Sequence, residues 1–260
     1  MRLLPVLLIL VLAAACGPEA GDTQGTAPPD TLRILAYNIH HAEGMDEVTD
    51  LNRIAALIRE VNPDLVALQE VDSVVTRTNG VDQAAELGRL TGLEPVFGRF
   101  MAYQGGAYGM SLLSRLQIVE SDNLRLPDGD EPRTSVSATV RTPNGRQLRF
   151  SGIHFYRTEE ERLAQATTLE EILAQGNLPE ILAGDFNSEP GSAVMTYLGD
   201  RWTTLDKGDD RYTFSSFDPV REIDFVLVRP SGAFSVLQHR LLDDPVMSDH
   251  RPVLTELVMH

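Results

Sequence analysis

The sequence predicts an α/β fold in which two mixed β-sheets pack face to face and helices cover both outer surfaces, a four-layer α-β-β-α sandwich. Strand-like and helix-like segments alternate along the chain, and several neighbouring strands are joined by hairpins, which a purely parallel sheet does not allow. The chain has 260 residues, of which 42% are hydrophobic, which suits one large α/β domain or two small ones.

The first residues lie outside this predicted domain. Residues 1–15 combine a basic Arg2, an apolar run and small residues, a pattern typical of a secretory signal peptide. The apolar run of Leu3–Ala15 is too short for a comfortable membrane span. We therefore expect an exported protein whose signal is removed.

Cys16, the only cysteine, follows three alanines as in a bacterial lipobox, although Leu12 stands one place earlier than the usual leucine. Lipidation of Cys16 would anchor the protein to the membrane, facing the periplasm or the cell exterior. An ordinary cleaved signal is the alternative. Residues 16–30 are rich in Gly, Pro, Thr and acids, so we expect a flexible tether that leads to a folded domain at 31–260.

The N-terminal half of the domain begins with a strand pattern at Thr31–Ile39. Asp50 can cap a helix over Leu51–Val61, whose apolar residues recur on one face. Apolar, β-rich runs then predict further strands, and the residues between the first two of them predict a second helix. These strands are Leu65–Val71, Pro95–Phe100 and Tyr108–Leu113, and the helix is Val81–Leu90.

The C-terminal half opens with a hairpin, because Pro143-Asn144-Gly145 is a strong turn signal between two strand patterns, 134–140 and 147–155. Thr158 and Glu161 have the spacing of a capping box before a helix that Gly176 ends. The remaining expected elements are a buried strand at Ile181–Ala183, a short helix near Ser192–Leu198 and strands at Ile223–Arg229, Phe234–Leu241 and Pro252–Val258.

The net charge of −16 bears on the partners of the protein. Acidic residues outnumber basic ones 38 to 22, whereas nonspecific binding to nucleic acid relies on Lys and Arg against phosphates. A long nucleic acid is thus an unfavourable partner, although a local basic groove would escape this average. Nearly all of the basic residues are arginines, which suit small phosphate groups.

We expect the protein to be a monomer.

Polar residues interrupt the ends of the predicted strands. Each alone has an ordinary explanation as a turn former, a loop acid or a hydrogen-bonded histidine. Asp224 is the exception, because Ile223 and Phe225 flank it in an apolar strand, and a buried carboxylate needs a partner. The set comprises Asn38, Gln69-Glu70, His154, Asp185, Asn187, Asp224 and Asp249-His250.

In six short pieces that follow one another in order, this set resembles the endonuclease/exonuclease/phosphatase superfamily, whose members resemble pancreatic deoxyribonuclease in fold. The pieces are LAYNIH, LQEVD, GIHF, AGDFNSEP, REIDFVLV and SDHRPV, and they span about residues 32–257. Residues 77–92 and YGMSLLSR extend the likeness to a bacterial branch similar to phosphatases and phosphodiesterases.

The resemblance implies a metal-dependent hydrolase of phosphoesters. Glu70 would be the main ligand of Mg²⁺, with Mn²⁺ or Ca²⁺ as alternatives, because Mg²⁺ takes few protein carboxylates and keeps water and substrate phosphate as ligands. Asn38 would hold Glu70 or a metal-bound water, and Asp249 would be a second carboxylate near the metal.

The same resemblance assigns the catalytic groups. Asp185 would accept the proton of the attacking water, and Asn187 would bind a phosphate oxygen or that water. His154 and His250 would bracket the phosphate, and Asp224 would hold His250 in its charged form. No covalent intermediate is expected.

The substrate pocket is less defined by the sequence. Arg77, Asp82 and Tyr108 are candidate substrate-binding residues, with a surface loop and an ordinary turn as the alternative. His40 and His41 are interpreted as loop or substrate-facing residues, with a second metal site as the alternative. Met110 and the Ile153–Tyr156 stretch depart from family patterns, which leaves the substrate open.

The function expected from these residues is hydrolysis of a small or lipid-linked phosphoester outside the cytoplasm. Two alternatives stay open. One is a secreted nuclease acting on DNA, which the acidity disfavours. The other is an anchored binding module without catalysis, which would have lost Asp185, Asn187 or a histidine; none is lost.

Overall fold

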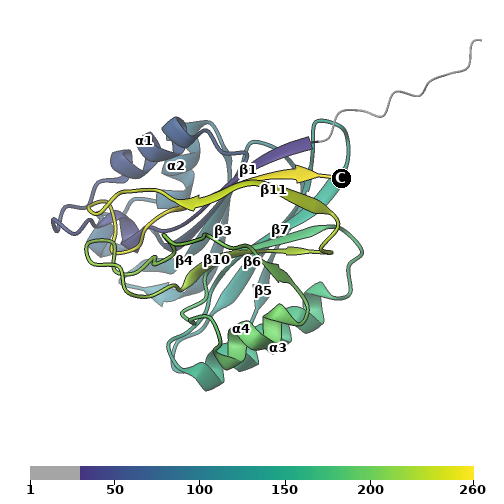
Figure 1. Ribbon diagram of the computed structural model, residues 1–260. Helices are drawn as coiled ribbons and strands as arrows, with labels where there is room; N and C mark the ends of the chain where they lie inside the picture. Colours follow the sequence, from purple (N-terminus) through teal and green to yellow (C-terminus); the bar gives the residue numbers. More distant parts are fainter. Residues whose placement is uncertain (1–29) are drawn as a thin grey trace, which may run out of the picture.

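Two six-stranded sheets lie face to face in the computed structural model, which describes residues 30–260, and helices cover both outer sides (Figure 1). The predicted four-layer sandwich is confirmed. The predicted signal peptide (1–15), Cys16 and the predicted tether up to residue 29 lie outside the described residues. The tether was predicted to end at Asp30, which is wrong, because Asp30 is buried and begins the first strand. None of the helices within 30–260 is both long and apolar enough to cross a membrane.

The first sheet has a parallel pair, β1 and β2, at its centre, with antiparallel strands on either side. Its strand order is β11 (Phe234–Leu241), β12 (Val253–Met259), β1 (Asp30–Asn38), β2 (Leu65–Ser73), β4 (Gly106–Ser114) and β3 (Glu94–Tyr103). Helices α1 (Leu51–Val61) and α2 (Gln83–Thr91) cover its outer face.

The second sheet repeats this plan around the parallel pair β7 and β8. Its strand order is β5 (Gln117–Arg125), β6 (Thr134–Arg141), β7 (Gln147–His154), β8 (Glu180–Asp185), β10 (Asp224–Arg229) and β9 (Thr203–Thr204). Helices α3 (Glu159–Leu173) and α4 (Ala193–Gly199) pack on its outer face. Two short 3-10 turns, η1 (His40–Ala42) and η2 (Thr76–Thr78), follow β1 and β2.

The core is split by the alternation of side chains along each strand. In β1, Leu32, Ile34 and Ala36 enter the core between the two sheets, whereas Leu35 and Tyr37 face the helices. The other central strands alternate in the same way. The sandwich therefore has three apolar layers, and the middle one ends where the central strands end.

Most of the helix caps and turns predicted from local sequence signals are confirmed. Asp50 caps α1 by accepting a hydrogen bond from Asn52 N, and the hairpin between β6 and β7 closes through Gly145. The capping box predicted at Thr158 is wrong: the Thr158 hydroxyl donates to Glu161, whose other oxygen accepts from Asp130 N. Glu161 is thus used to hold a neighbouring loop.

Strands β5 and β9 were not predicted. Most side chains of β5 are exposed and polar, because it is the outermost strand of its sheet, and a two-residue strand such as β9 leaves no pattern. Several strands are also longer in the structure than predicted. For example, β3 extends over Glu94–Tyr103, whereas the sequence predicted Pro95–Phe100.

Candidate active site

The candidate site lies where the middle apolar layer ends. At this edge of four central strands, the side chain due to face that layer is polar. Three of these residues end their strands, Asn38 in β1, His154 in β7 and Asp185 in β8, and Asp224 begins the antiparallel β10. Asp185 is aligned with both His154 and Asp224. The fold therefore turns residues from both sheets toward one another.

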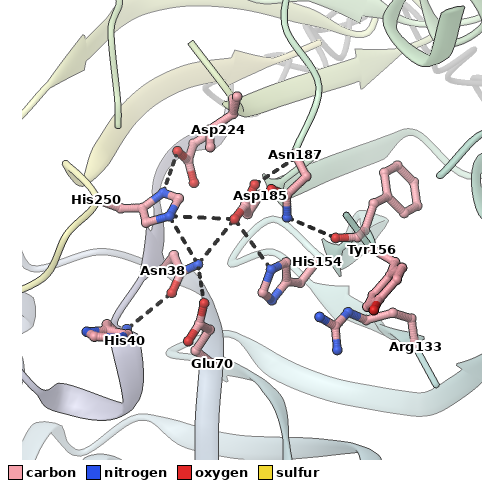
Figure 2. Close-up of polar contacts among 12 residues, drawn as sticks. Asn38, His40, Glu70, Arg133, His154, Tyr156, Asp185, Asn187, Asp224 and His250 are labelled. Carbon is pink, nitrogen blue, oxygen red and sulfur yellow. Dashed lines mark hydrogen bonds and ion pairs between the residues drawn. The ribbon is translucent and has the colours of Figure 1, made fainter. Parts of the chain in front are cut away.

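Glu70 reaches the site through an irregularity in β2. By simple alternation after Ala67 and Gln69, its side chain would face the helices. The register of β2 against β4 shifts between Gln69 and Val71, and Glu70 has a left-handed φ of 57°. Such a bulge re-aims a side chain at the end of a strand. Figure 2 shows Glu70 directed toward Asn38.

Asp185 is the hub of the site (Figure 2). Its Oδ2 accepts a hydrogen bond from Asn38 Nδ2 at 3.2 Å and lies 3.5 Å from His154 Nε2 and 3.7 Å from His250 Nε2. Its Oδ1 accepts from Asn187 N at 2.8 Å. Gly184, just before it, leaves room for this packing, because a Cβ there would lie 2.1 Å from Ile153 O.

Burial governs the protonation of this hub. Asp185 is only 1% exposed, and burial together with the nearby charge of Asp224 raises its pKa to about 7. A carboxyl group with such a pKa can exchange a proton near neutral pH.

His250 belongs to the loop before β12 but contacts residues of the second sheet. Its Nδ1 lies 2.9 Å from Asp224 Oδ2, so this carboxylate fixes the imidazole and leaves Nε2 facing Asp185. Burial lowers the pKa of His250, but the Asp224 carboxylate outweighs it and raises the pKa to about 10. His250 is therefore protonated at neutral pH.

His154 has the opposite character. Burial and the neighbouring Arg133 hold its pKa well below the usual range, so its imidazole is neutral. Its Nε2 is directed toward Asp185, and its Nδ1 is buried with no partner within residues 30–260. The two histidines thus bring one charged and one neutral ring to the same carboxylate.

Asn187, predicted to interrupt the end of a strand, lies just beyond the strand that carries Asp185. Strand β8 ends at Asp185, and Asn187 follows in a left-handed conformation with φ of 49°. Its Nδ2 donates to Phe155 O at 3.0 Å, which ties the loop to the end of β7. The turn, rather than strand alternation, brings its amide beside Asp185.

The first sheet supplies a more open half of the site. Asn38 Nδ2 donates to Glu70 Oε1 at 3.1 Å, while Asn38 Oδ1 accepts from His40 N at 3.1 Å. Asn38 thus links Glu70 to Asp185 and holds the carboxylate of Glu70 in place. Glu70 is only half-buried, and its Oε2 accepts no hydrogen bond within the described chain.

Asp249 is half-buried at the edge of the site. Its Oδ1 accepts a bond from Ser248 Oγ at 3.3 Å, and no contact with Glu70 joins the two in residues 30–260. Its charge nevertheless contributes to the raised pKa of His250. The structure therefore places Asp249 within electrostatic reach of His250.

The pocket candidates separate into two groups. Arg77 and Tyr108 line a hollow of about 160 Å³ with Met101, Tyr103 and Glu131. Arg77 Nε and Nη2 bind the Asp72 carboxylate at 2.7 and 2.8 Å, and its guanidinium lies 5.5 Å from the Tyr108 ring centre.

Asp82 belongs to the other group. Its Oδ1 caps α2 by accepting from Ala85 N, and its Oδ2 accepts from Ser73 Oγ. Both oxygens are used by the fold, so Asp82 is placed as a structural residue.

Gly106 and Gly109 likewise serve strand packing rather than close approach of a ligand, because a Cβ at Gly109 would lie 2.0 Å from Gly98 O.

The sequence interpretation missed Arg133. Only 5% exposed, it lies beside His154 and Tyr156 in Figure 2, with its guanidinium 4.9 Å from the Phe100 ring centre. It forms an ion pair with Glu131, while its Nε is buried and unpartnered among the described residues. The only sequence signal is an arginine directly before a buried strand, which alone is too weak.

A family model described as the Endonuclease/Exonuclease/phosphatase family matches residues 35–250. Among curated proteins, no sequence matches this chain. Among solved structures, an endonuclease/exonuclease/phosphatase from Beutenbergia cavernae DSM 12333 aligns with a TM-score of 0.74 and 24% identity, over 88% of this chain and 72% of that one.

Two further structures have more specific names. The mannosyl-6-phosphatase of Bacteroides thetaiotaomicron VPI-5482 aligns with a TM-score of 0.72 and 22% identity, over 88% of this chain and 100% of its own. The human Nocturnin catalytic domain aligns with a TM-score of 0.70 and 22% identity, over 88% and 95%. With a family match across most of its length and this shared fold, the chain belongs to the endonuclease/exonuclease/phosphatase family.

Proposed function

We propose that this protein hydrolyses a small or lipid-linked phosphoester by direct attack of water, with a divalent cation as cofactor. The observation that carries the proposal is the position of Asp185. A buried carboxyl group with a pKa of about 7 contacts a protonated and a neutral histidine, and Asn38 connects it to Glu70. Family membership supports a hydrolase acting on phosphoesters.

The residues fit a divalent cation at Glu70. This carboxylate is half-buried, is aimed by its bulge and has one oxygen without a hydrogen bond in the described chain. Glu70 would hold the cation with water molecules, Asn38 would orient Glu70, and Asp249 would add negative charge nearby. Mg²⁺ suits such an oxygen-rich, water-retaining site, with Mn²⁺ or Ca²⁺ as alternatives. A bound cation would neutralise charge on the phosphoryl oxygens.

The protein's own groups supply the proton chemistry. Asp185 in its ionised form accepts a proton from the attacking water, since its raised pKa matches neutral pH. Asn187 positions the water or a phosphate oxygen. His250, charged because of Asp224, stabilises the negative charge that grows on the phosphoryl group and can protonate the leaving oxygen. His154 donates a hydrogen bond from its neutral ring to the phosphoryl group.

Arg133 is proposed as an additional contact to the substrate. The support is its position beside His154 and its Nε, which is buried without a hydrogen-bond partner among residues 30–260. Arg77 and Tyr108 would line the adjoining hollow and contact the rest of the substrate. The small size of that hollow favours a compact group over a nucleic acid strand.

We further propose that the protein acts as a monomer after export, anchored through Cys16. The support for export and for the anchor is the sequence of residues 1–30 alone. Labelling of the expressed protein with a radioactive fatty acid tests the anchor, with Cys16→Ser as the control. Label retained in that variant would contradict lipidation of Cys16.

The test of the function is a substrate panel with and without EDTA. It should hold sugar phosphates, among them mannose 6-phosphate because of the name of one structural neighbour, together with nucleotides, inositol phosphates, phospholipids and plasmid DNA. We expect EDTA-sensitive release of phosphate or cleavage of a small diester, absent in Asp185→Asn. Cleavage of plasmid DNA alone would favour the nuclease alternative, and binding without turnover of any compound would favour the binding module.

A further inference from the structure

We propose that His40, His41 and Glu70 form a second metal site, one that takes a transition-metal cation such as Zn²⁺ through two imidazole nitrogens and one carboxylate oxygen. One ligand atom from each of the three residues lies within 4.8 Å of the others. Mg²⁺ prefers oxygen ligands, whereas imidazole suits Zn²⁺ and its neighbours in the first transition row. The site would share only Glu70 with the proposed hydrolytic centre.

The backbone of η1 supports a specialised role. His40, His41 and Ala42 have φ values of 46°, 44° and 64°, three left-handed residues in a row without a glycine. Such a conformation is unfavourable for L-residues and is kept only where the surroundings impose it. It turns two adjacent imidazoles toward the end of β2, with ring centres 4.5 Å apart.

Buried hydrogen bonds hold this turn in place. Gln83 of α2, only 1% exposed, donates from Nε2 to His41 O at 2.7 Å and accepts from Asp72 N through Oε1. His40 N donates to Asn38 Oδ1, the residue that also positions Glu70. The turn and the carboxylate are thus fixed relative to each other by the same amide.

The hydrogen-bond partners of the two rings are compatible with metal binding. His40 Nδ1 lies 3.2 Å from Glu43 O, so the tautomer that donates from Nδ1 to this carbonyl has its lone pair on Nε2. His41 Nε2 lies 3.5 Å from Glu43 Oε2, which favours a proton there and leaves the lone pair on Nδ1. That Nδ1 is buried without a partner in the described structure, and the His41 side chain is 9% exposed.

These outer contacts are of the kind that orient metal-binding histidines, in which the nitrogen that does not bind metal donates to a carbonyl or carboxylate. Glu43 provides both, through its backbone oxygen for His40 and its side chain for His41. Two histidines and a carboxylate leave at least one position open for water or substrate, as in sites where the metal takes part in binding.

Zinc titration calorimetry and Co²⁺ absorption spectroscopy on the metal-stripped full chain test the site. Cys16→Ser is included throughout to remove the one thiol, and excess Mg²⁺ is present. We expect one equivalent of Zn²⁺ or Co²⁺ to bind. In His40→Asn/His41→Asn the affinity should fall at least a hundredfold, because Asn tolerates the left-handed backbone but removes both imidazoles. His260→Ala, which removes an exposed histidine elsewhere, should bind as the parent does.

Three results would overturn the proposal: no Zn²⁺ or Co²⁺ binding in the presence of Mg²⁺, unchanged binding in the double Asn variant, or loss of binding only in Asp224→Asn. The last result would assign the metal to the separate cluster of Asp185, Asp224 and His250. Since binding is read without substrate, Asp185→Asn should bind Zn²⁺ normally even though it is inactive. A failure of the proposed hydrolysis would therefore leave this test intact.

Discussion

The two sheets contribute unlike halves to one site. From the second sheet come Asp185, Asp224 and His154, all less than 5% exposed and joined to one another or to His250. The first sheet contributes Glu70 and His40, which are half-buried beside a left-handed turn.

The difference shows how one cleft can support two kinds of chemistry. Burial shifts pKa values and so suits proton transfer, which explains the raised pKa of Asp185 on the second-sheet side. Partial exposure leaves a carboxylate reachable by a hydrated cation, which suits Glu70. Asn38 bridges the halves, with one amide nitrogen directed at both carboxylates.

The largest effect is expected from Asp185→Asn on the buried side. It should lower kcat by roughly four orders of magnitude, because the general base and the anchor of the attacking water are lost together. The substitution keeps the shape of the side chain. Stopped assays of phosphate release at saturating substrate measure it.

The stability of the same variant sharpens the comparison. The folded-state pKa of Asp185 is raised above its usual value of 3.8 to about 7, so the ionised carboxyl costs stability progressively as pH rises through that window. Asp185→Asn should therefore melt at or above the parent's Tm at pH 8. A clearly lower Tm at pH 8 would show that burial does not strain this carboxylate.

Glu70→Gln tests the open side and should have the next largest effect. We expect a loss of roughly three orders of magnitude in metal-dependent activity and little change in Tm without metal, since Glu70 is half-buried. The rise in Tm that Mg²⁺ gives the parent by binding the folded state should disappear. Asp249→Asn is the matched control: because Asp249 does not contact Glu70 in the described residues, it should keep most of this rise.

Asp224→Asn should lower activity by about a hundredfold and destabilise the fold by about 3 kcal/mol, because it leaves the buried, charged His250 without its partner. The pKa of His250 is raised, so the pair's stability is present below the usual pKa of 6.5 and is lost as pH rises through about 10. The variant's deficit should thus be clear at pH 6–7 and shrink toward pH 10.

The pH profile of kcat/KM provides a second reading of Asp224→Asn. In the parent, the alkaline limb should follow deprotonation of His250 near pH 10. Without the Asp224 carboxylate the pKa of His250 falls, and that limb should move toward neutral pH. An alkaline limb that stays in place would contradict the role of Asp224 as the group that keeps His250 charged.

Much of the architecture could be predicted because strand and helix patterns are local properties of the sequence. The order of these segments and the hairpins between strands indicated the four-layer fold, and the strand patterns placed Asn38, Asp185 and Asp224 where apolar strands meet polar ends. The partner of Asp224 was expected from the cost of an unpaired buried carboxylate, and the structure places His250 there.

The rest depends on contacts between distant segments. The bulge that turns Glu70 into the site requires a left-handed glutamate, which no local pattern indicates. Arg133 looks like an ordinary loop arginine until β6 is packed beside His154. Glu161 could have completed a capping box, but Asp130 N competes for it. In each case a tertiary contact decides among local alternatives of similar energy.

The smallest effect is expected from Asp82→Ala, and it separates the pocket from its support. The structure uses both Asp82 oxygens to cap α2 and to bind Ser73, so the variant should lose about 1 kcal/mol of stability, as for other N-caps. The KM of Asp82→Ala should be unchanged. Arg133→Lys should raise KM severalfold, because lysine keeps the charge but loses the planar guanidinium beside His154. Thermal melts and steady-state kinetics on the two variants measure both quantities. A raised KM with an unchanged Tm in Asp82→Ala would return Asp82 to the substrate pocket, because a residue that acts only through the fold cannot affect substrate binding without affecting stability.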